Sequence, residues 1–536
     1  MTNCIRLAWL GVLVSTVGCA HRVPLWKDGK PECRIVVRNA ENRAQRLGQS
    51  TINYYLREFY DVELPVASET VRPGTYIMLG TPETRKEIAG LVGDKLAAAA
   101  DIGDEGFELL THNDGKSNYV IVYGNTPRAV KHGCQELVFF RTAATRSGGF
   151  VDWPLKMTMK PEFAYRGTYM LPCWSAHDSV ESWQRVLRFN SELTLNRNWF
   201  WLDGFPVAGH TGEYAGTDLA DDGNVQRLID LTNSEDMKFY VGGGWFTWHH
   251  AKAVGKDLAR GRDYYLEYLK AFKGIRGFYI EPTGEGGETG NWKAEAVALR
   301  ELIDTTLNQE KDFEFAIAIG KFNNPEYHRI MARCDPKRVF WWWCWGDPIQ
   351  LKALDLYPSV LRWHVITRMS DFHGSMEAPL PSERRLTGYA TSYDPGQGFG
   401  NPWNGWGKLG VDKPRNVHPH TVPHFGHQYL FRERCWNVDL SETDFVARLH
   451  RRLFDADAPA NAGALYWRLT QMTLKVNLGA KADATALAPI QAFLVTTRGR
   501  TWTPRMTDTL ARMEEAVEHL AELAAKPPQP ATSPAK

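Results

Sequence analysis

The sequence predicts a (β/α)8 barrel, preceded by a small α+β sandwich domain and followed by C-terminal helices. Two observations favour this fold class. The chain of 536 residues is too long for a single core. Between about residues 163 and 455, short apolar runs alternate with helix-like segments, which is the barrel pattern. Aromatic and acidic residues follow these runs, at the positions where such barrels carry their active sites.

The first 22 residues predict a lipoprotein signal peptide. Arg6 supplies the positive charge, and Leu7–Val17 is an apolar run too short to span a bilayer. The following Thr-Val-Gly-Cys, ending at Cys19, resembles a bacterial lipobox. Ala20 is not the Asp that marks inner-membrane retention, so we expect an outer-membrane lipoprotein of the bacterial cell envelope. Its only membrane contact is then the lipid on Cys19; plain secretion is the alternative.

Composition and spacing predict no nucleic-acid partner and no cofactor. Lys and Arg (63) nearly balance Asp and Glu (62), so no basic surface is expected. Six cysteines beyond the signal have spacings that fit no zinc or redox motif, so we expect isolated buried thiols: Cys33, Cys134, Cys173, Cys334, Cys344 and Cys435. Prolines interrupt a histidine-rich stretch that has no carboxylate partner, which argues against a metal site: His418, His420, His424 and His427.

Residues 30–155 predict the N-terminal α+β domain, which holds no evident catalytic cluster. A helix is expected to begin at Pro127 with Thr126 as its cap. The expected strands are Arg34–Val37, Thr75–Gly80, and a hairpin of Gly106–Thr111 with Tyr119–Tyr123.

Residues 163–455 predict the catalytic barrel. Its expected strands are Tyr165–Met170, Asn198–Leu202, Lys238–Gly243, Gly277–Ile280, Phe313–Ile319, Arg338–Cys344, Leu361–Thr367 and Leu386–Ala390. Side chains able to hold a ligand follow these strands: Trp174, Asp203, Trp245, Trp248, Glu281, Glu285, Glu288, Trp345, Asp347, Asp371, Tyr393 and Asp394. Sugar rings pack on aromatic faces and sugar hydroxyls need acceptors, so the pattern predicts a carbohydrate substrate. Some of these tryptophans must alternate into the barrel wall.

The N-terminal pattern "EGFEL…YVIVYGNTPRAVKHGCQEL" resembles the non-catalytic domain that precedes the barrel in family 20 β-hexosaminidases and family 67 α-glucuronidases. The segment Pro161–Gly167 also matches the opening P-x-F-x-x-R-G of the barrel in both families. We therefore expect Arg166, within this segment, to bind substrate.

The stretch "GFYIEPTGEGGETG" is similar to the acid-bearing loop of family 67 α-glucuronidases. The resemblance implies that Glu285 is the general acid. Glu281 replaces a family lysine that helps to bind the substrate carboxylate, so a uronic acid is not the expected substrate. The family has two candidate base carboxylates on later barrel strands. Asp347 lies near the position of one of them, and Asp371 is the carboxylate nearest to the position of the other.

These residues predict an exo-acting glycoside hydrolase. One carboxyl protonates the leaving oxygen while a second activates water, which inverting enzymes achieve with carboxyl groups about 6.5–9.5 Å apart. Two alternatives stay open. One is a catalytically inactive carbohydrate-binding lipoprotein. The other is a substrate-assisted hexosaminidase, although Gly286-Gly287-Glu288 stands where Gly-Gly-Asp-Glu would be expected.

Residues 456–525 predict a helical region beside the barrel, and its last helix is expected from Pro504 to Ala525 on the spacing of its apolar residues. Residues 526–536 are rich in Pro, Ala and Ser and predict a disordered tail. The oligomeric state is left open.

Overall fold

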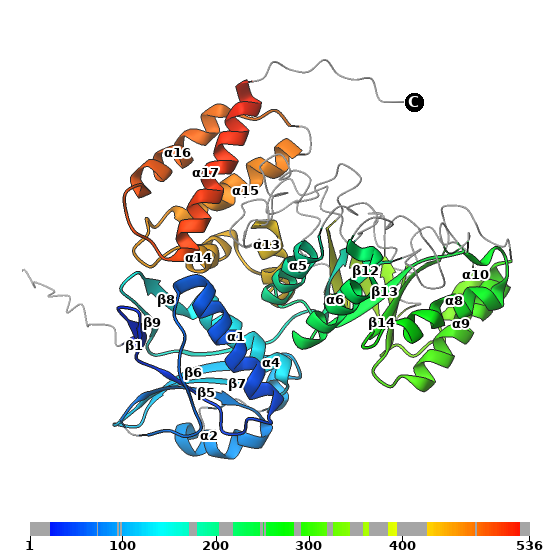
Figure 1. Cartoon of the computed structure of the whole chain (residues 1–536), viewed down its shortest axis with the longest axis horizontal. Helices are drawn as coiled ribbons and strands as arrows, with labels where there is room; N and C mark the ends of the chain where they lie inside the picture. The colour runs from blue at the N-terminus through cyan, green and yellow to red at the C-terminus, as the bar shows by residue number, and fades with distance from the viewer. Residues whose placement is uncertain are drawn as a thin grey trace, which may run out of the picture.

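The structure is a computed structural model with three parts: an N-terminal α+β domain, a barrel and a group of C-terminal helices (Figure 1). It describes residues 22–71, 73–93, 96, 99–170, 179–202, 218–246, 250, 253–282, 291–318, 325–343, 357, 359–363, 384–393, 426–477 and 480–525.

The N-terminal domain contains two sheets with helices packed on them. The four-stranded sheet has the order β2 (Lys30–Pro31), β1 (Arg22–Lys27), β9 (Gly148–Asp152) and β8 (Thr142–Thr145). The six-stranded sheet has the order β10 (Lys156–Met159), β6 (Phe107–Asn113), β7 (Asn118–Gly124), β5 (Thr75–Gly80), β3 (Arg34–Val36) and β4 (Val66–Ala67). The helices are α1 (Arg43–Tyr60), α2 (Arg85–Val92), α3 (Ala99–Ile102) and α4 (Pro127–Glu136).

Local sequence signals determine several of these elements. Helix α4 begins at Pro127, and the Thr126 side chain accepts a hydrogen bond from the Ala129 amide at 3.2 Å, as the capping pattern predicts. Strands β6 and β7 form the expected antiparallel hairpin. The domain begins earlier than predicted, because β1 starts at Arg22 and pairs with β9.

Within the described residues, eight parallel strands form a closed barrel, which confirms the predicted fold class. They are β11 (Tyr165–Met170), β12 (Arg197–Trp201), β13 (Lys238–Trp245), β14 (Gly277–Pro282), β15 (Glu314–Ala318), β16 (Val339–Trp343), β17 (Val360–Trp363) and β18 (Gly388–Tyr393). Parallel pairing of β18 with β11 closes the barrel.

Successive side chains along a strand point alternately into the barrel and outward, so the strands contribute to two apolar layers. On β14, Phe278 and Ile280 pack outward in the main core, while Tyr279 points into the barrel. Helices α5 (Val180–Glu192), α6 (Asp222–Ser234), α8 (Leu258–Ala271), α9 (Trp292–Gln309) and α10 (Pro325–Met331) lie on the outside of the barrel (Figure 1). The interior cluster consists of Tyr169, Trp199, Trp201, Tyr240, Tyr279, Ala316, Ala318, Phe340, Trp342 and Ala390, with Tyr165 partly buried against it.

An ion-pair network closes the N-terminal end of the barrel. Arg197 donates two hydrogen bonds to Glu314, at 2.9 and 3.0 Å, and Lys238 donates a third at 2.7 Å. Burial opposes ionisation of Glu314, but Arg197 and Lys238 lower its pKa to about 2. The Tyr240 hydroxyl also donates to Glu314. Paired charges and the aromatic ring of Tyr165, over which the Arg197 guanidinium lies, therefore occupy this end of the barrel.

Glu105 of the N-terminal domain joins that domain to the same end of the barrel. It accepts hydrogen bonds from Arg166 of β11, Arg128 of α4 and Asn196. Arg166 is fully buried and also donates to the carbonyl oxygens of Thr194 and Phe163. Glu105 and Arg166 come from different domains, so separating the domains would leave the buried Arg166 guanidinium without its carboxylate partner.

Five described helices follow the barrel strands and pack on the N-terminal domain as well as on the barrel; the first two fall within the range 163–455 predicted for the barrel, and the last three within 456–525. They are α13 (Gly426–Trp436), α14 (Glu442–Leu453), α15 (Ala462–Asn477), α16 (Ala484–Thr497) and α17 (Pro504–Ala525), and the last has the predicted bounds. Helix α13 packs on β18. Helix α17 packs on α1 (Figure 1). Buried Glu136 of α4 pairs with Arg448 of α14 at 2.8 Å. The three parts thus share interfaces. In the described portion of the chain, no helix has the length and apolar character needed to cross a bilayer.

Candidate active site

The candidate active site lies at the C-terminal ends of the barrel strands, where Glu281 is the penultimate residue of β14. Tyr279 and Glu281 are two positions apart and therefore share the inward face of this strand. Glu281 is half-buried. A carboxylate thus stands at the inner edge of the barrel mouth, at the position where barrel enzymes carry catalytic groups.

Four buried aromatic side chains form an aromatic floor in the barrel interior at this end: Tyr169, Trp201, Tyr279 and Trp342. The Tyr279 ring centroid lies 4.3 Å from that of Trp342, 5.1 Å from that of Tyr169 and 6.0 Å from that of Trp201. Tyr169 meets Trp342 edge-on at 4.9 Å. Edge-to-face and tilted contacts at these distances fix ring orientations, so the floor is a rigid surface.

The Tyr279 hydroxyl donates a hydrogen bond to Glu281 Oε2 at 3.2 Å. A hydroxyl that donates to a carboxylate favours its ionised form and limits its orientations. The aromatic floor and the carboxylate are therefore physically linked through one residue.

Small residues flank Glu281 on both neighbouring strands. Gly244 of β13 is its register partner. On β15, Ile317 pairs with Ile280, which puts Ala318 at the level of Glu281. Neither Gly244 nor Ala318 has a bulky side chain, so neither neighbouring strand places one beside the carboxylate.

Side chains of α8 hold the ends of β12 and β13 from outside the barrel. The Tyr265 hydroxyl donates to the carbonyl oxygens of Gly243 and Gly244, at 3.1 and 2.8 Å. The Tyr268 hydroxyl donates to the carbonyl oxygen of Leu202 at 2.6 Å. Since buried carbonyl groups at strand ends need donors, these two tyrosines fix the backbone that borders the site.

His250 supports the sharp turn that follows β13. Phe246 has a φ of 55°, a backbone conformation that bulky L-residues rarely adopt. Its amide donates to His250 Nδ1 at 2.6 Å, and His250 Nε2 lies 3.1 Å from the carbonyl oxygen of Gly261. Burial lowers the pKa of His250 to about 4, so the ring is neutral at pH 7 and its Nδ1 can accept.

Arg166 and Trp245 do not face the site, contrary to their predicted substrate contacts. Arg166 is the second residue of β11 and lies at the N-terminal end of the barrel, in the interdomain contact with Glu105. Trp245 is fully buried on the outward side of β13, where its ring stacks on His250 with a centroid distance of 5.3 Å. Arg166 is thus an interdomain contact, and Trp245 belongs to the layer between β13 and α8.

The remaining predicted site residues lie outside the described residues, apart from Glu281 and the backbone of Tyr393. They are Trp174, Asp203, Trp248, Glu285, Glu288, Trp345, Asp347, Asp371 and Asp394, together with the predicted lipidation residue Cys19. The pairing of Glu285 with a second carboxylate therefore stays a prediction. Tyr393 ends β18 and pairs in register with Met170.

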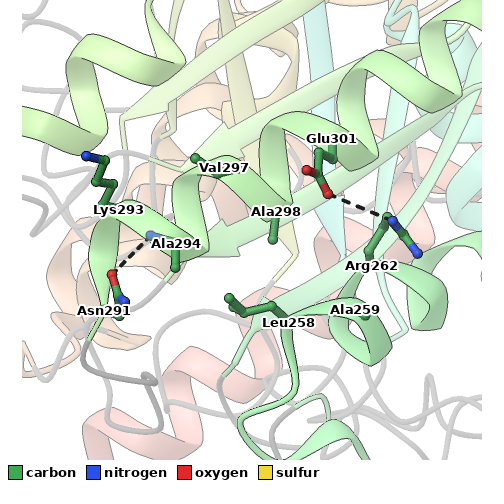
Figure 2. A pocket seen from close by; sticks show the side chains of 9 residues that line it. All are labelled: Leu258, Ala259, Arg262, Asn291, Lys293, Ala294, Val297, Ala298 and Glu301. Carbon is green, nitrogen blue, oxygen red and sulfur yellow. Dashed lines mark hydrogen bonds and ion pairs between the residues drawn. The ribbon is translucent and has the colours of Figure 1, made fainter.

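A groove with a volume of about 460 Å³ lies between α8 and α9 on the outside of the barrel (Figure 2). Arg262 and Glu301 form an ion pair of 3.8 Å across it. Its other lining residues are Leu258, Ala259, Asn291, Lys293, Ala294, Val297 and Ala298. Because the β-strand wall separates this groove from the barrel interior, it is distinct from the candidate active site.

In the described residues, no group of three or more His, Cys, Asp or Glu side chains is arranged to hold a metal ion. Four of the cysteines expected to be isolated thiols, Cys33, Cys134, Cys334 and Cys435, are free and buried. His427, from the histidine-rich stretch, is buried with its Nε2 3.0 Å from Gln428 Nε2.

Comparison with known proteins shows a likeness of fold. No protein-family model matches the chain, and no curated protein matches it. The solved structure of CpGH84D has a TM-score of 0.54 with 11% identity, covering 92% of this chain and 86% of that one. The solved structure of CpGH84B has a TM-score of 0.53 with 13% identity, covering 93% of this chain and 86% of that one. The structure of the GH20 β-N-acetylhexosaminidase of Streptomyces coelicolor A3(2) has a TM-score of 0.54 with 11% identity, covering 86% of this chain and 94% of that one.

These matches cover most of each chain, so the shared fold extends beyond the barrel. They confirm the predicted family 20-like glycoside hydrolase architecture at the level of fold.

Proposed function

We propose that this protein is a glycoside hydrolase that cleaves a poly- or oligosaccharide in the mouth of the barrel. The observation that carries the proposal is the half-buried Glu281 carboxylate beside a floor of four buried aromatic rings. A further support is the fold shared with a β-N-acetylhexosaminidase.

The described groups suit a sugar that carries no negative charge. Sugar hydroxyls donate to carboxylates, and the buried aromatic floor holds Glu281 in place through Tyr279. Tyr279 donates to Glu281 and so favours its ionised form. An ionised carboxylate repels a uronic acid, so the proposed substrate is a neutral or N-acetylated amino sugar.

The proposed chemistry is proton transfer to the leaving oxygen by Glu285 as the glycosidic C–O bond breaks. In the inverting form, Asp347 or Asp371 takes a proton from the water that attacks the anomeric carbon. In the substrate-assisted form, the carbonyl oxygen of the sugar's own acetamido group attacks that carbon, and water later opens the cyclic intermediate. The fold shared with a β-N-acetylhexosaminidase supports keeping the second form as a candidate.

Turnover of matched aryl glycosides tests the proposal. The panel contains 4-nitrophenyl β-glucoside, N-acetyl-β-glucosaminide and β-glucuronide, their α-anomers, and natural oligosaccharides. We expect hydrolysis of a neutral or N-acetylated member and poor hydrolysis of the glucuronides. Preference for a glucuronide contradicts the proposed substrate charge.

Within an active N-acetylated series, the two mechanisms differ in their response to fluorine. Replacing the acetyl group by trifluoroacetyl makes its carbonyl oxygen a weaker nucleophile. The rate then falls steeply in the substrate-assisted form and little in the inverting form. If the folded protein binds sugars but hydrolyses none, the inactive carbohydrate-binding lipoprotein is the correct description.

We also propose that the protein is exported and attached to the outer membrane through a lipid on Cys19. The signal-like first 22 residues and the lipobox-like sequence support this proposal. Expression of Cys19→Ala in a bacterial host should move the protein from the membrane fraction to the soluble fraction. An unchanged membrane fraction contradicts lipid anchoring.

A further inference from the structure

We propose that Tyr279 is a positioning residue for the proposed hydrolysis, acting through Glu281. The inference deepens the proposed function and rests on it for the activity measurements. The structural contact at its centre is the hydrogen bond from the Tyr279 hydroxyl to Glu281 Oε2 at 3.2 Å.

The Tyr279 ring is held on several sides. Its centroid lies 4.3 Å from that of Trp342 and 5.1 Å from that of Tyr169, and the side chain is 1% exposed. These rings come from β16 and β11, so two different strands restrain it. A buried ring packed at these distances has little rotational freedom, so its hydroxyl has a fixed position.

The backbone of Tyr279 is equally constrained. A Cβ built on Gly242 of β13 would lie 1.6 Å from the Tyr279 carbonyl oxygen. Only a glycine allows the two strands to approach this closely. The hydroxyl is therefore fixed from both ends of the residue, by its ring contacts and by its main chain.

The neighbouring strands provide no side-chain donor beside Glu281 at this level. Gly244 is its register partner on β13, and Ala318 is the equivalent residue of β15. Neither has a polar side-chain atom. The Tyr279 hydroxyl thus contacts the carboxylate from within the β13–β15 wall, and the packing of the aromatic floor holds that hydroxyl in place.

A double-mutant cycle with Tyr279→Phe and Glu281→Ala tests this role. Tyr279→Phe removes the hydroxyl and keeps the ring. We expect kcat on the best glycoside to fall on the order of 10-fold, the size of one lost hydrogen bond to a charged group, with KM changed less than about twofold. In the Glu281→Ala background, Tyr279→Phe should lower kcat no further.

Tyr165→Phe is the matched control, because it removes a hydroxyl at the other end of the barrel interior, where the Tyr165 ring packs on Phe340 with a centroid distance of 4.0 Å. It should leave kcat unchanged. An unchanged kcat for Tyr279→Phe contradicts the proposal, and so does an equal loss in both Glu281 backgrounds.

The same four proteins, unfolded in urea, separate this proposal from the proposed function. If no glycoside is hydrolysed, the proposed function fails, but the unfolding midpoints still report whether Tyr279 and Glu281 are coupled. We expect Tyr279→Phe to shift the midpoint differently in the two backgrounds. Equal shifts mean that the two side chains do not interact, and they overturn the positioning role.

Discussion

Glu281 and Glu285 are four residues apart in the chain, and their proposed roles differ. Glu281 has the Tyr279 hydroxyl as a hydrogen-bond donor, which suits an ionised group that orients a ligand. Glu285 is proposed to deliver a proton, so it must be protonated when substrate binds. Two neighbouring carboxyl groups with opposite protonation states are a recurrent arrangement in glycosidases.

The identity of the acid is tested by the leaving group. Glu285→Gln should reduce turnover of a natural glycan about 10²–10⁴-fold, because general acid catalysis is lost. The loss should be much smaller for 4-nitrophenyl glycosides, whose leaving group needs little protonation. Asp347→Asn should slow both substrates equally in the inverting form. Steady-state kinetics on both substrates measures these ratios, and equal losses for Glu285→Gln on both contradict its role as the acid.

His250 makes the stability of the β13 turn depend on pH. Its folded pKa of about 4 lies below the unfolded value of about 6.5, so the neutral native ring favours folding above pH 6.5. This contribution is lost as the pH falls from about 6.5 to 4, at up to roughly 1.4 kcal/mol per pH unit.

We predict that His250→Asn removes this dependence, because asparagine does not titrate in this range and its amide oxygen can accept from the Phe246 amide. Urea unfolding at pH 7 and pH 5 measures the effect as the difference between wild type and variant. The same pH dependence in both proteins contradicts a buried neutral His250.

At the scale of the strand, apolar runs predicted the barrel well because described strands bury apolar side chains on their outward face, as Phe278 and Ile280 of β14 do. Predicted and observed bounds coincide for β11 and differ by one residue for β12. The apolar runs alone could not show which side chains of a strand point outward and which point into the barrel. A strict period of two, counted from Phe278 and Ile280, would have identified Tyr279 and Glu281 as inward.

The same reasoning explains the two site residues that were wrongly expected at the mouth. Arg166 is the second residue of its strand, and the ends of parallel strands that carry active sites are the C-terminal ends. Trp245 lies on the outward face, an odd number of residues from the inward Tyr240. The α8 tyrosines Tyr265 and Tyr268 were missed because nothing in a helical apolar pattern reveals which carbonyl groups their hydroxyls reach.

Strand packing also gives a test of the barrel interior. Gly242→Ala should destabilise the protein strongly, by about 3 kcal/mol or more, because its Cβ would lie 1.6 Å from the Tyr279 carbonyl oxygen. Gly90→Ala is the matched control, since its Cβ meets nothing within 4 Å and α2 gains a better helix former. Thermal unfolding of both variants measures the difference, and similar melting temperatures contradict the close strand approach.

At the scale of the whole molecule, buried ion pairs join the three parts. Burial alone would raise the pKa of Glu105, but Arg166 and Arg128 hold it well below its usual range. Burial likewise raises the pKa of Glu136, but Arg448 lowers it, and the pKa is about 2. Both carboxyl groups have lower pKa values when folded than when unfolded. They stabilise the fold above about pH 4, and this contribution is lost as the pH falls toward 2.

Glu105→Gln should therefore cost about 3–5 kcal/mol, because Arg166 stays buried without its carboxylate. Glu63→Gln is the control, since its pair with Arg57 is exposed and such pairs contribute about 0–1 kcal/mol. Urea unfolding at pH 7 measures both. An effect of Glu105→Gln as small as that of the control contradicts an interdomain contact that stabilises the barrel.

The measurement that tests the central proposal most directly is hydrolysis by the purified protein and by Glu285→Gln and Glu281→Gln, with folding checked by circular dichroism. We expect the wild type to release monosaccharide from at least one neutral or N-acetylated glycan. We expect both variants to remain folded and to lose most of this activity. A folded wild type that binds sugars and hydrolyses no member of the panel contradicts the proposed glycoside hydrolase, as does full activity in both variants.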